Sequence, residues 1–176
     1  ILQANPTIES VNTGMKSLSI LDMLNTKYII YSPKAAPIVN TAALGNAWLV
    51  KDIIWVNTAD EELAALTNFN PATTAIVDKK WKTNLNNIAS LTIDTSAHIK
   101  LLSYKPNDLV YESKTASDQL AVFSEIFYEK GWNAYVDGKL IPHGRANYVL
   151  RAMLVPSGTH NIEFKFEPRS YYYGKK

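Results

Sequence analysis

Hydrophobic and polar residues alternate along the second half of the chain. The clearest run is His160–Glu167, in which Ile162, Phe164 and Phe166 fall on one side and polar residues fall between them. A period of two is typical of a half-exposed antiparallel strand. The same alternation begins near Ser90. We therefore predict that residues 86–170 form one β domain, with Phe164 in its core.

Turn residues separate the predicted strands. Asp137-Gly138 lies between two short extended pairs, and this dipeptide favours a type I′ hairpin because both residues tolerate positive φ. Further strands are predicted over 99–101, 108–114, 120–127 and 147–155. Six or so short strands at this spacing indicate an antiparallel β-sandwich of the jelly-roll or immunoglobulin-like kind.

The first half of the chain mixes helices and strands. Ser17–Asn25 and a segment starting at Thr58 are predicted helices, and the second has a capping box in Thr58 and Glu61. Leu63 and Leu66 are its expected buried positions. Predicted strands are Tyr28–Tyr31, expected to be buried, Trp48–Val56 and Thr74–Val77. We therefore expect an α+β fold, mainly β, in which a small α/β segment over residues 1–85 precedes the sandwich.

Composition narrows the class of protein. Of 176 residues, 47% are hydrophobic and 19% are charged, and the net charge is only +2. This balance is globular and argues against nucleic acid as a partner. No apolar run approaches the ~20 residues of a membrane helix. The chain also starts without a signal segment, so we expect a soluble piece of a larger protein; a mature protein that lost its leader is the alternative.

No catalytic, metal or cofactor motif is present. The glycines form no phosphate-binding loop, no Gly-x-Ser-x-Gly elbow occurs, and the chain has no cysteine. His98, His143 and His160 lie in different predicted elements. Asp118 and Asp137 stand where turns favour Asp. We predict no catalytic residues, no metal site and no cofactor.

Aromatic and polar residues cluster around the predicted hairpin. An aromatic ring fits the apolar face of a sugar, and Asn and Arg fit its hydroxyl groups. The candidate ligand-binding residues are Trp132, Tyr135, Arg145, Asn147 and Arg151. The alternative is structural, since aromatic side chains fill sandwich cores and the arginines can bond loop carbonyls.

The end of the chain has the composition of a membrane interface. Tyr171, Tyr172 and Tyr173 are followed by Lys175 and Lys176. Tyrosine and lysine are common where a chain meets the bilayer. We therefore expect residues 171–176 to be a membrane-proximal tail.

Several blocks of sequence resemble the YfhO-like bacterial membrane proteins. They are Phe127–Lys139, Arg145–Ala152, Val155–His160 and Glu163–Pro168, with Met23–Ile30 and Leu44–Trp48 upstream. The resemblance implies a polytopic inner-membrane protein whose large extracytoplasmic domain lies near its C-terminus. Where the family usually has Pro-Gly-Trp, this chain has Lys130-Gly131-Trp132, so the turn is less rigid.

The resemblance also carries an expected function. Such proteins are similar to GT-C-type glycosyltransferases that modify cell-envelope glycans with sugars carried on polyprenyl phosphate. Their acidic catalytic loops lie outside this chain, so no catalytic residue carries over. We expect an extracytoplasmic accessory domain that contacts the parent's membrane part, glycan or polyprenyl-linked sugar. The alternative is a stand-alone carbohydrate- or protein-binding module, which a full gene with apolar spans on both sides would exclude.

Overall fold

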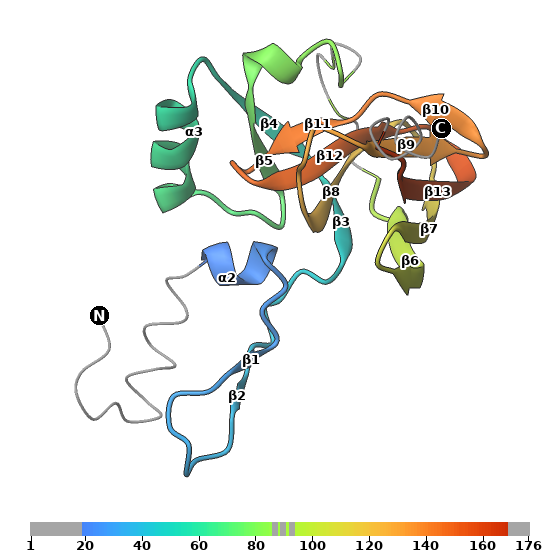
Figure 1. Ribbon diagram of the computed structural model, residues 1–176. Coiled ribbons are helices and arrows are strands. Elements are labelled where there is room, and N and C mark those ends of the chain that lie inside the picture. Colours follow the sequence, from blue (N-terminus) through green and yellow to red (C-terminus); the bar gives the residue numbers. More distant parts are fainter. Residues whose placement is uncertain (1–18, 86–87, 89–90, 92–93, 169–176) are drawn as a thin grey trace.

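The computed structural model describes residues 19–85, 88, 91 and 94–168 (Figure 1). The helices are α2 (Ser19–Met23) and α3 (Ala59–Ala65), with the short 3-10 helices η1 (Leu66–Asn68) and η2 (Lys79–Trp81). The strands are β1 (Tyr28–Ile29), β2 (Ile38–Val39), β3 (Ala47–Val50), β4 (Asp52–Val56), β5 (Thr74–Asp78), β6 (His98–Lys105), β7 (Asp108–Thr115), β8 (Gln119–Ile126), β9 (Trp132–Val136), β10 (Lys139–Ile141), β11 (Gly144–Ala146), β12 (Leu150–Val155) and β13 (Gly158–Phe166). The predicted tail over 171–176 lies outside the described residues.

Two antiparallel sheets form the centre of the molecule. One has the order β10-β9-β13-β7-β6, and the other has the order β11-β12-β8-β3. Their facing sides bury a cluster that includes Tyr111, Phe123, Met153, Ile162 and Phe164. The predicted antiparallel sandwich is confirmed, and Phe164 lies in its core with no exposed surface.

The four-stranded sheet is covered on both faces. Its other side packs on a unit formed by the parallel pair β4 and β5 with α3, in a second cluster that includes Ile76, Leu120 and Val122. Strand β12 is therefore buried at five of its six positions, and β8 is buried at its first five positions in a row, rather than at every second one. A strand between two apolar layers does not alternate, since both of its faces leave water.

The first half of the chain contributes to the sandwich as well. The predicted strand Trp48–Val56 is two strands, because the chain changes sheets at Lys51: β3 pairs with β8, while β4 pairs with β5. The sandwich thus takes one strand from before residue 85. The division into segments at that residue stays a prediction.

Two expectations about burial in this half are wrong. In α3 the buried residues are Leu66, just past its end, and Glu62, whereas Leu63 is 50% exposed. Strand β1 is exposed, not buried, because it belongs to a two-stranded ribbon that leaves the body of the molecule (Figure 1). Of the two hydrogen bonds in the predicted capping box of α3, only one is formed. Thr58 accepts from Glu61 N, but the Glu61 carboxylate accepts from Asn57 N rather than from Thr58.

The Asp137-Gly138 turn is the predicted type I′ hairpin. Both residues have positive φ, at 50° and 78°, and Val136 pairs with Lys139 across the turn. In the part of the chain that the structure describes, no helix is long and apolar enough to cross a membrane.

Candidate functional site

The five candidate residues lie in three places. Arg145 and Asn147 lie where the four-stranded sheet meets the unit formed by α3, β4 and β5. Trp132 and Arg151 meet between the two sheets. Tyr135 belongs to the same strand as Trp132, β9, but lies on the outer face of the five-stranded sheet. The structure thus brings together part of the predicted site.

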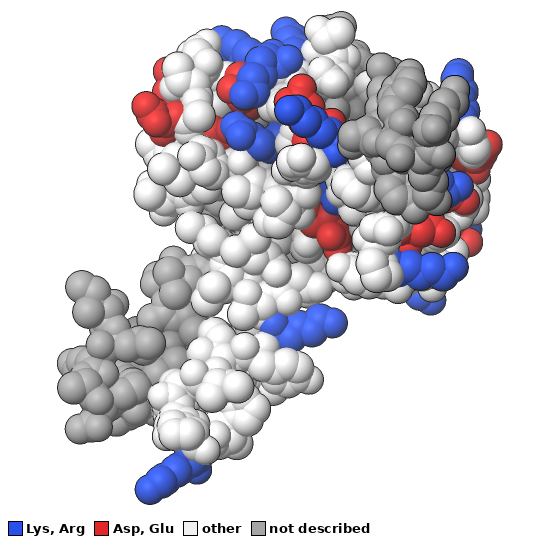
Figure 2. All heavy atoms as spheres, in the orientation of Figure 1, with Lys and Arg blue, Asp and Glu red and all other residues white. Residues whose placement is uncertain are grey.

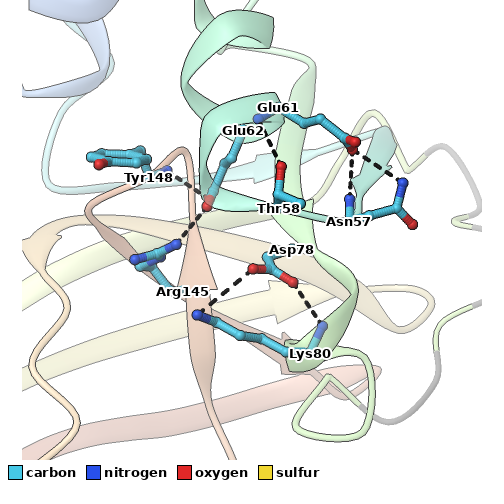
Figure 3. A network of polar contacts seen from close by, with 8 residues as sticks. All are labelled: Asn57, Thr58, Glu61, Glu62, Asp78, Lys80, Arg145 and Tyr148. Atoms are coloured by element: carbon cyan, nitrogen blue, oxygen red, sulfur yellow. Dashed lines mark hydrogen bonds and ion pairs between the residues drawn. The ribbon is translucent and has the colours of Figure 1, made fainter.

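Arg145 forms an ion pair with Glu62 (Figure 3). Its Nη2 lies 2.6 Å from Glu62 Oε2, and the other carboxylate oxygen accepts from Tyr148 N at 2.8 Å. Glu62 is completely buried, while the Arg145 side chain is 20% exposed. The guanidinium also lies 5.3 Å from the ring centroid of Tyr148. Both oxygens of the carboxylate are therefore satisfied from β11 and the turn after it.

Asn147 joins that turn to β5. Its backbone has φ 50°, its N–H donates to Ile76 O, and its side-chain oxygen accepts from Ile76 N. A buried Asn in this conformation pairs with the edge of β5 as a further strand residue would. These contacts favour the structural alternative for Arg145 and Asn147.

Arg151 is a buried cation between the two sheets. It is 2% exposed, its guanidinium carbon lies 4.0 Å from the Trp132 ring centroid, and its Nε donates to Ile126 O at 3.2 Å. As predicted, it points away from the side on which Leu150 packs. Desolvation lowers the pKa of Arg151, although the nearby Glu125 carboxylate opposes that shift.

On the outer face, Glu167 links two residues of β9. One of its oxygens accepts from Tyr135 Oη at 2.7 Å and from Asn133 Nδ2 at 2.8 Å. These bonds lower the pKa of Glu167, because they stabilise its charged form. The hydrogen bond to Glu167 in turn raises the pKa of Tyr135.

A cleft of about 590 Å³ opens beside these residues. We call it the hairpin cleft. It is lined by Glu129, Lys130, Gly131, Trp132, Asn133, Leu140, Glu167 and Pro168. The Trp132 ring packs against the Arg151 guanidinium, and the Phe166 ring centroid lies 5.3 Å from it. An aromatic residue, two acidic residues, an asparagine and a lysine thus line one hollow.

Gly131 lets the backbone approach Phe166 and Pro168 closely at the edge of this cleft. Its φ is 103°, and a Cβ there would lie 2.8 Å from Phe166 Cε2 and 3.1 Å from Pro168 Cβ. Its carbonyl accepts from Glu167 N at 2.6 Å. Gly131 therefore positions Trp132 although Lys130, and not a proline, precedes it.

A second cleft, of about 340 Å³, adjoins the first and shares Glu129, Asn133 and Leu140 with it. His143 lines it. Burial, and to a smaller degree the Arg151 cation, lower the pKa of His143 to about 4. This imidazole is therefore neutral near pH 7.

Sequence reasoning missed four residues of these places: Glu62, Asn133, Leu140 and Glu167. Glu62 lies in the acidic first turn of α3, and Glu167 ends the alternating run His160–Glu167, so neither carries a local signal for a site. Asn133 lies two positions before Tyr135 in the same strand, so its only local signal is that both side chains point to the same face of the sheet. Among the described residues, no group of three His, Asp or Glu side chains is placed to hold a metal ion. The side chains of the hairpin cleft suit binding of a polar ligand that has one apolar face.

Comparison with known proteins gives one match. A family model described as bacterial membrane protein YfhO matches residues 79–175, more than half of the chain. The four later blocks of the sequence resemblance lie inside this range, and the two upstream blocks lie before it. No curated protein and no solved structure matches the chain.

Proposed function

Because the chain belongs to the YfhO family of bacterial membrane proteins, we propose that it is the extracytoplasmic accessory domain of a polytopic parent and that it binds envelope glycan in the hairpin cleft. The parent, by the resemblance of its sequence blocks, is a GT-C-like glycosyltransferase that uses polyprenyl-linked sugar. The domain holds glycan near the parent's membrane part and carries out no chemistry itself.

The observation that carries this proposal is the composition of the hairpin cleft. Trp132 lines the cleft, and its ring packs against a buried cation. Glu129, Asn133 and Glu167 also line it and supply acceptors and a donor. A sugar presents C–H groups on one face and hydroxyl groups at its edge, so this combination matches it in both respects. The volume of the cleft, about 590 Å³, lies within the range of small-molecule sites.

Contact with the parent's membrane part is the competing function of this surface. Leu140 and Tyr128 are 61% and 54% exposed beside the cleft, and exposed large side chains are frequent in protein interfaces. A glycan ligand requires the polar groups of the cleft, whereas a protein contact depends mainly on Leu140 and Tyr128.

Titration of the 176-residue chain with oligosaccharides released from bacterial envelope separates the two. We expect Asn133→Ala to weaken glycan binding about tenfold, the loss of one good hydrogen bond. Leu140→Ala should weaken glycan binding less than Asn133→Ala does. Leu102→Ala is the matched control, since Leu102 is 54% exposed on β6, the opposite outer strand of the same sheet.

Absence of glycan binding by the wild-type chain would refute the proposal. So would binding that survives Asn133→Ala and Glu167→Gln together. Retained parent activity in those variants, with loss in Leu140→Ala, would assign the surface to a protein contact.

The accessory role is tested separately. We expect the chain to leave chromogenic glycosides and sugar-phosphate donors unchanged. Reproducible turnover that a single Asp or Glu substitution abolishes would show that the chain is itself an enzyme.

A further inference from the structure

Residues 27–40 form an arm that extends away from both sheets (Figure 1). The arm is a ribbon of β1 and β2 with two residues in each strand. Every residue in this range is exposed or half-buried. A two-stranded ribbon that buries so little is marginal in water by itself.

The base of the arm is nevertheless fixed to the body. The Asn40 amide donates to Asp22 Oδ1 and to Thr26 O, and Asn40 N donates to Lys27 O. Ser124 of β8 then hydrogen-bonds the carbonyls of Met23 and Gly45, on either side of the arm. The ribbon is therefore held out from a defined point and does not fold back on the sheets.

The arm exposes large hydrophobic side chains on one face. Tyr28, Ile30 and Val39 are 63%, 77% and 59% exposed. Tyr28 and Val39 are directly opposite in the ribbon, and Ile30 follows Tyr28 at the two-residue spacing that places side chains on the same side. Ile20 and Leu24 of the neighbouring α2 segment are 38% and 39% exposed. Five of the twelve exposed large hydrophobic residues in the described part of the chain thus lie within residues 20–39.

The charge of the arm, residues 27–40, has a single sign. Between Asp22 and Asp52 the sequence has no acidic residue, and it has Lys27, Lys34 and Lys51. In Figure 2 the arm is white with blue at its tip and near its base, and the face shown carries no red. Aliphatic side chains, a tyrosine and lysines without acidic neighbours are the composition that suits a bilayer with anionic headgroups.

A second copy of the chain fits this arm less well. Pro33 and Pro37 lie in the tip, and proline removes the N–H that an added strand would need. Two like-charged arms would also repel each other. Because the family consists of bacterial membrane proteins, we expect a bilayer close to this domain.

We propose that residues 27–40 are a membrane-contacting arm that inserts Tyr28, Ile30 and Val39 at the interface of a bilayer containing anionic phospholipid. Lys27 and Lys34 then lie among the headgroups. The arm holds the domain at a set height above the bilayer, whatever ligand the hairpin cleft takes.

Co-sedimentation of the 176-residue chain with phospholipid vesicles tests the arm. We expect binding to vesicles of equal parts phosphatidylcholine and phosphatidylglycerol, and weaker binding to phosphatidylcholine alone. The double variant Ile30→Ser, Val39→Ser should lower the partition coefficient at least tenfold, since burying each large aliphatic side chain is worth about an order of magnitude. Lys34→Gln should lower it about fivefold on the anionic vesicles only.

Leu63→Ser and Leu102→Ser are the controls, because they remove leucines that are 50% and 54% exposed from α3 and β6, outside both the arm and the hairpin cleft. Both should bind as the unchanged chain does. A Tyr28→Trp variant gives a second readout, since its fluorescence should shift to shorter wavelength when vesicles are added. The substituted side chains are exposed, so thermal melts should be unchanged.

Three outcomes would overturn the proposal. They are no binding to either kind of vesicle, equal binding by the Ile30→Ser, Val39→Ser variant, and no fluorescence shift for Tyr28→Trp. A dimer in solution that the double variant dissociates, with vesicle binding unchanged, would instead make the arm a contact between copies. Each result is independent of glycan binding.

Discussion

Glu62 and Arg145 are 83 residues apart in sequence, yet Glu62 Oε2 and Arg145 Nη2 lie 2.6 Å from each other. Glu62 belongs to α3 and Arg145 to β11, so this ion pair joins the α/β unit to the four-stranded sheet. The pair stands in a buried site in which the carboxylate has no access to water.

Removing one partner of this pair should destabilise the fold strongly. We expect Arg145→Ala to lower the free energy of unfolding by about 3–5 kcal/mol, because it leaves a buried carboxylate without its counter-charge. Chemical denaturation measures this change. Asp60→Asn, in the exposed first turn of the same helix, is the control and should stay within about 0.5 kcal/mol. A loss no larger than the control's would show that the pair contributes little.

Arg151 should matter for stability through its hydrogen bond and its stacking on Trp132. We expect Arg151→Ala to cost about 1–3 kcal/mol, since Ile126 O loses its donor and the Trp132 ring loses the group behind it. Arg151→Met keeps much of the volume and should cost less than Arg151→Ala. Unchanged stability in both variants, with reduced activity of the parent protein, would assign Arg151 to binding.

The buried imidazole of His143 predicts a dependence of stability on pH. Its pKa is lowered to about 4 in the folded chain from 6.5, so between these values the unfolded chain binds more protons. Stability is therefore fully present above pH 6.5 and falls as the pH drops toward 4, by about 3 kcal/mol in total. Denaturation curves across this range should show the slope in the native chain and not in His143→Gln.

His160 serves as an internal comparison, because it acts in the opposite direction. Its hydrogen bond to Asp137 raises its pKa, and the resulting stability is lost as the pH rises. A slope that persists undiminished in His143→Gln would mean that another group causes it.

Phe164 is the residue on which the core between the sheets depends most directly. Its ring contacts those of Phe123, Tyr111 and His143 at 4.8, 6.3 and 5.6 Å between centroids. We expect Phe164→Ala to cost about 3–5 kcal/mol, the usual loss when a large core side chain is removed. Thermal melts against Leu102→Ala, an exposed position, check this. A shift of only a degree or two would place Phe164 outside the core.

Much of the fold was determined by local sequence patterns. The alternation of Ile162 and Phe164 with polar residues, the Asp137-Gly138 turn and the cap at Thr58 each depend on neighbours a few residues away. Such signals can be recognised in the sequence because neighbouring residues determine which face of a strand is buried and which backbone angles a turn adopts. The family resemblance carried by residues 127–168 is likewise readable from short runs of neighbouring residues.

Tertiary structure decided what lies beyond that distance. A second apolar layer buries both faces of β8 and β12, turns Glu62 inward and splits Trp48–Val56 between two sheets. The tertiary structure also leaves β1 on an exposed arm and places Glu167 beside Asn133 and Tyr135 at the hairpin cleft. Arg145 and Asn147 lie elsewhere, at the junction between the four-stranded sheet and the α/β unit. None of these outcomes has a local signal, because each depends on which surface a distant segment covers.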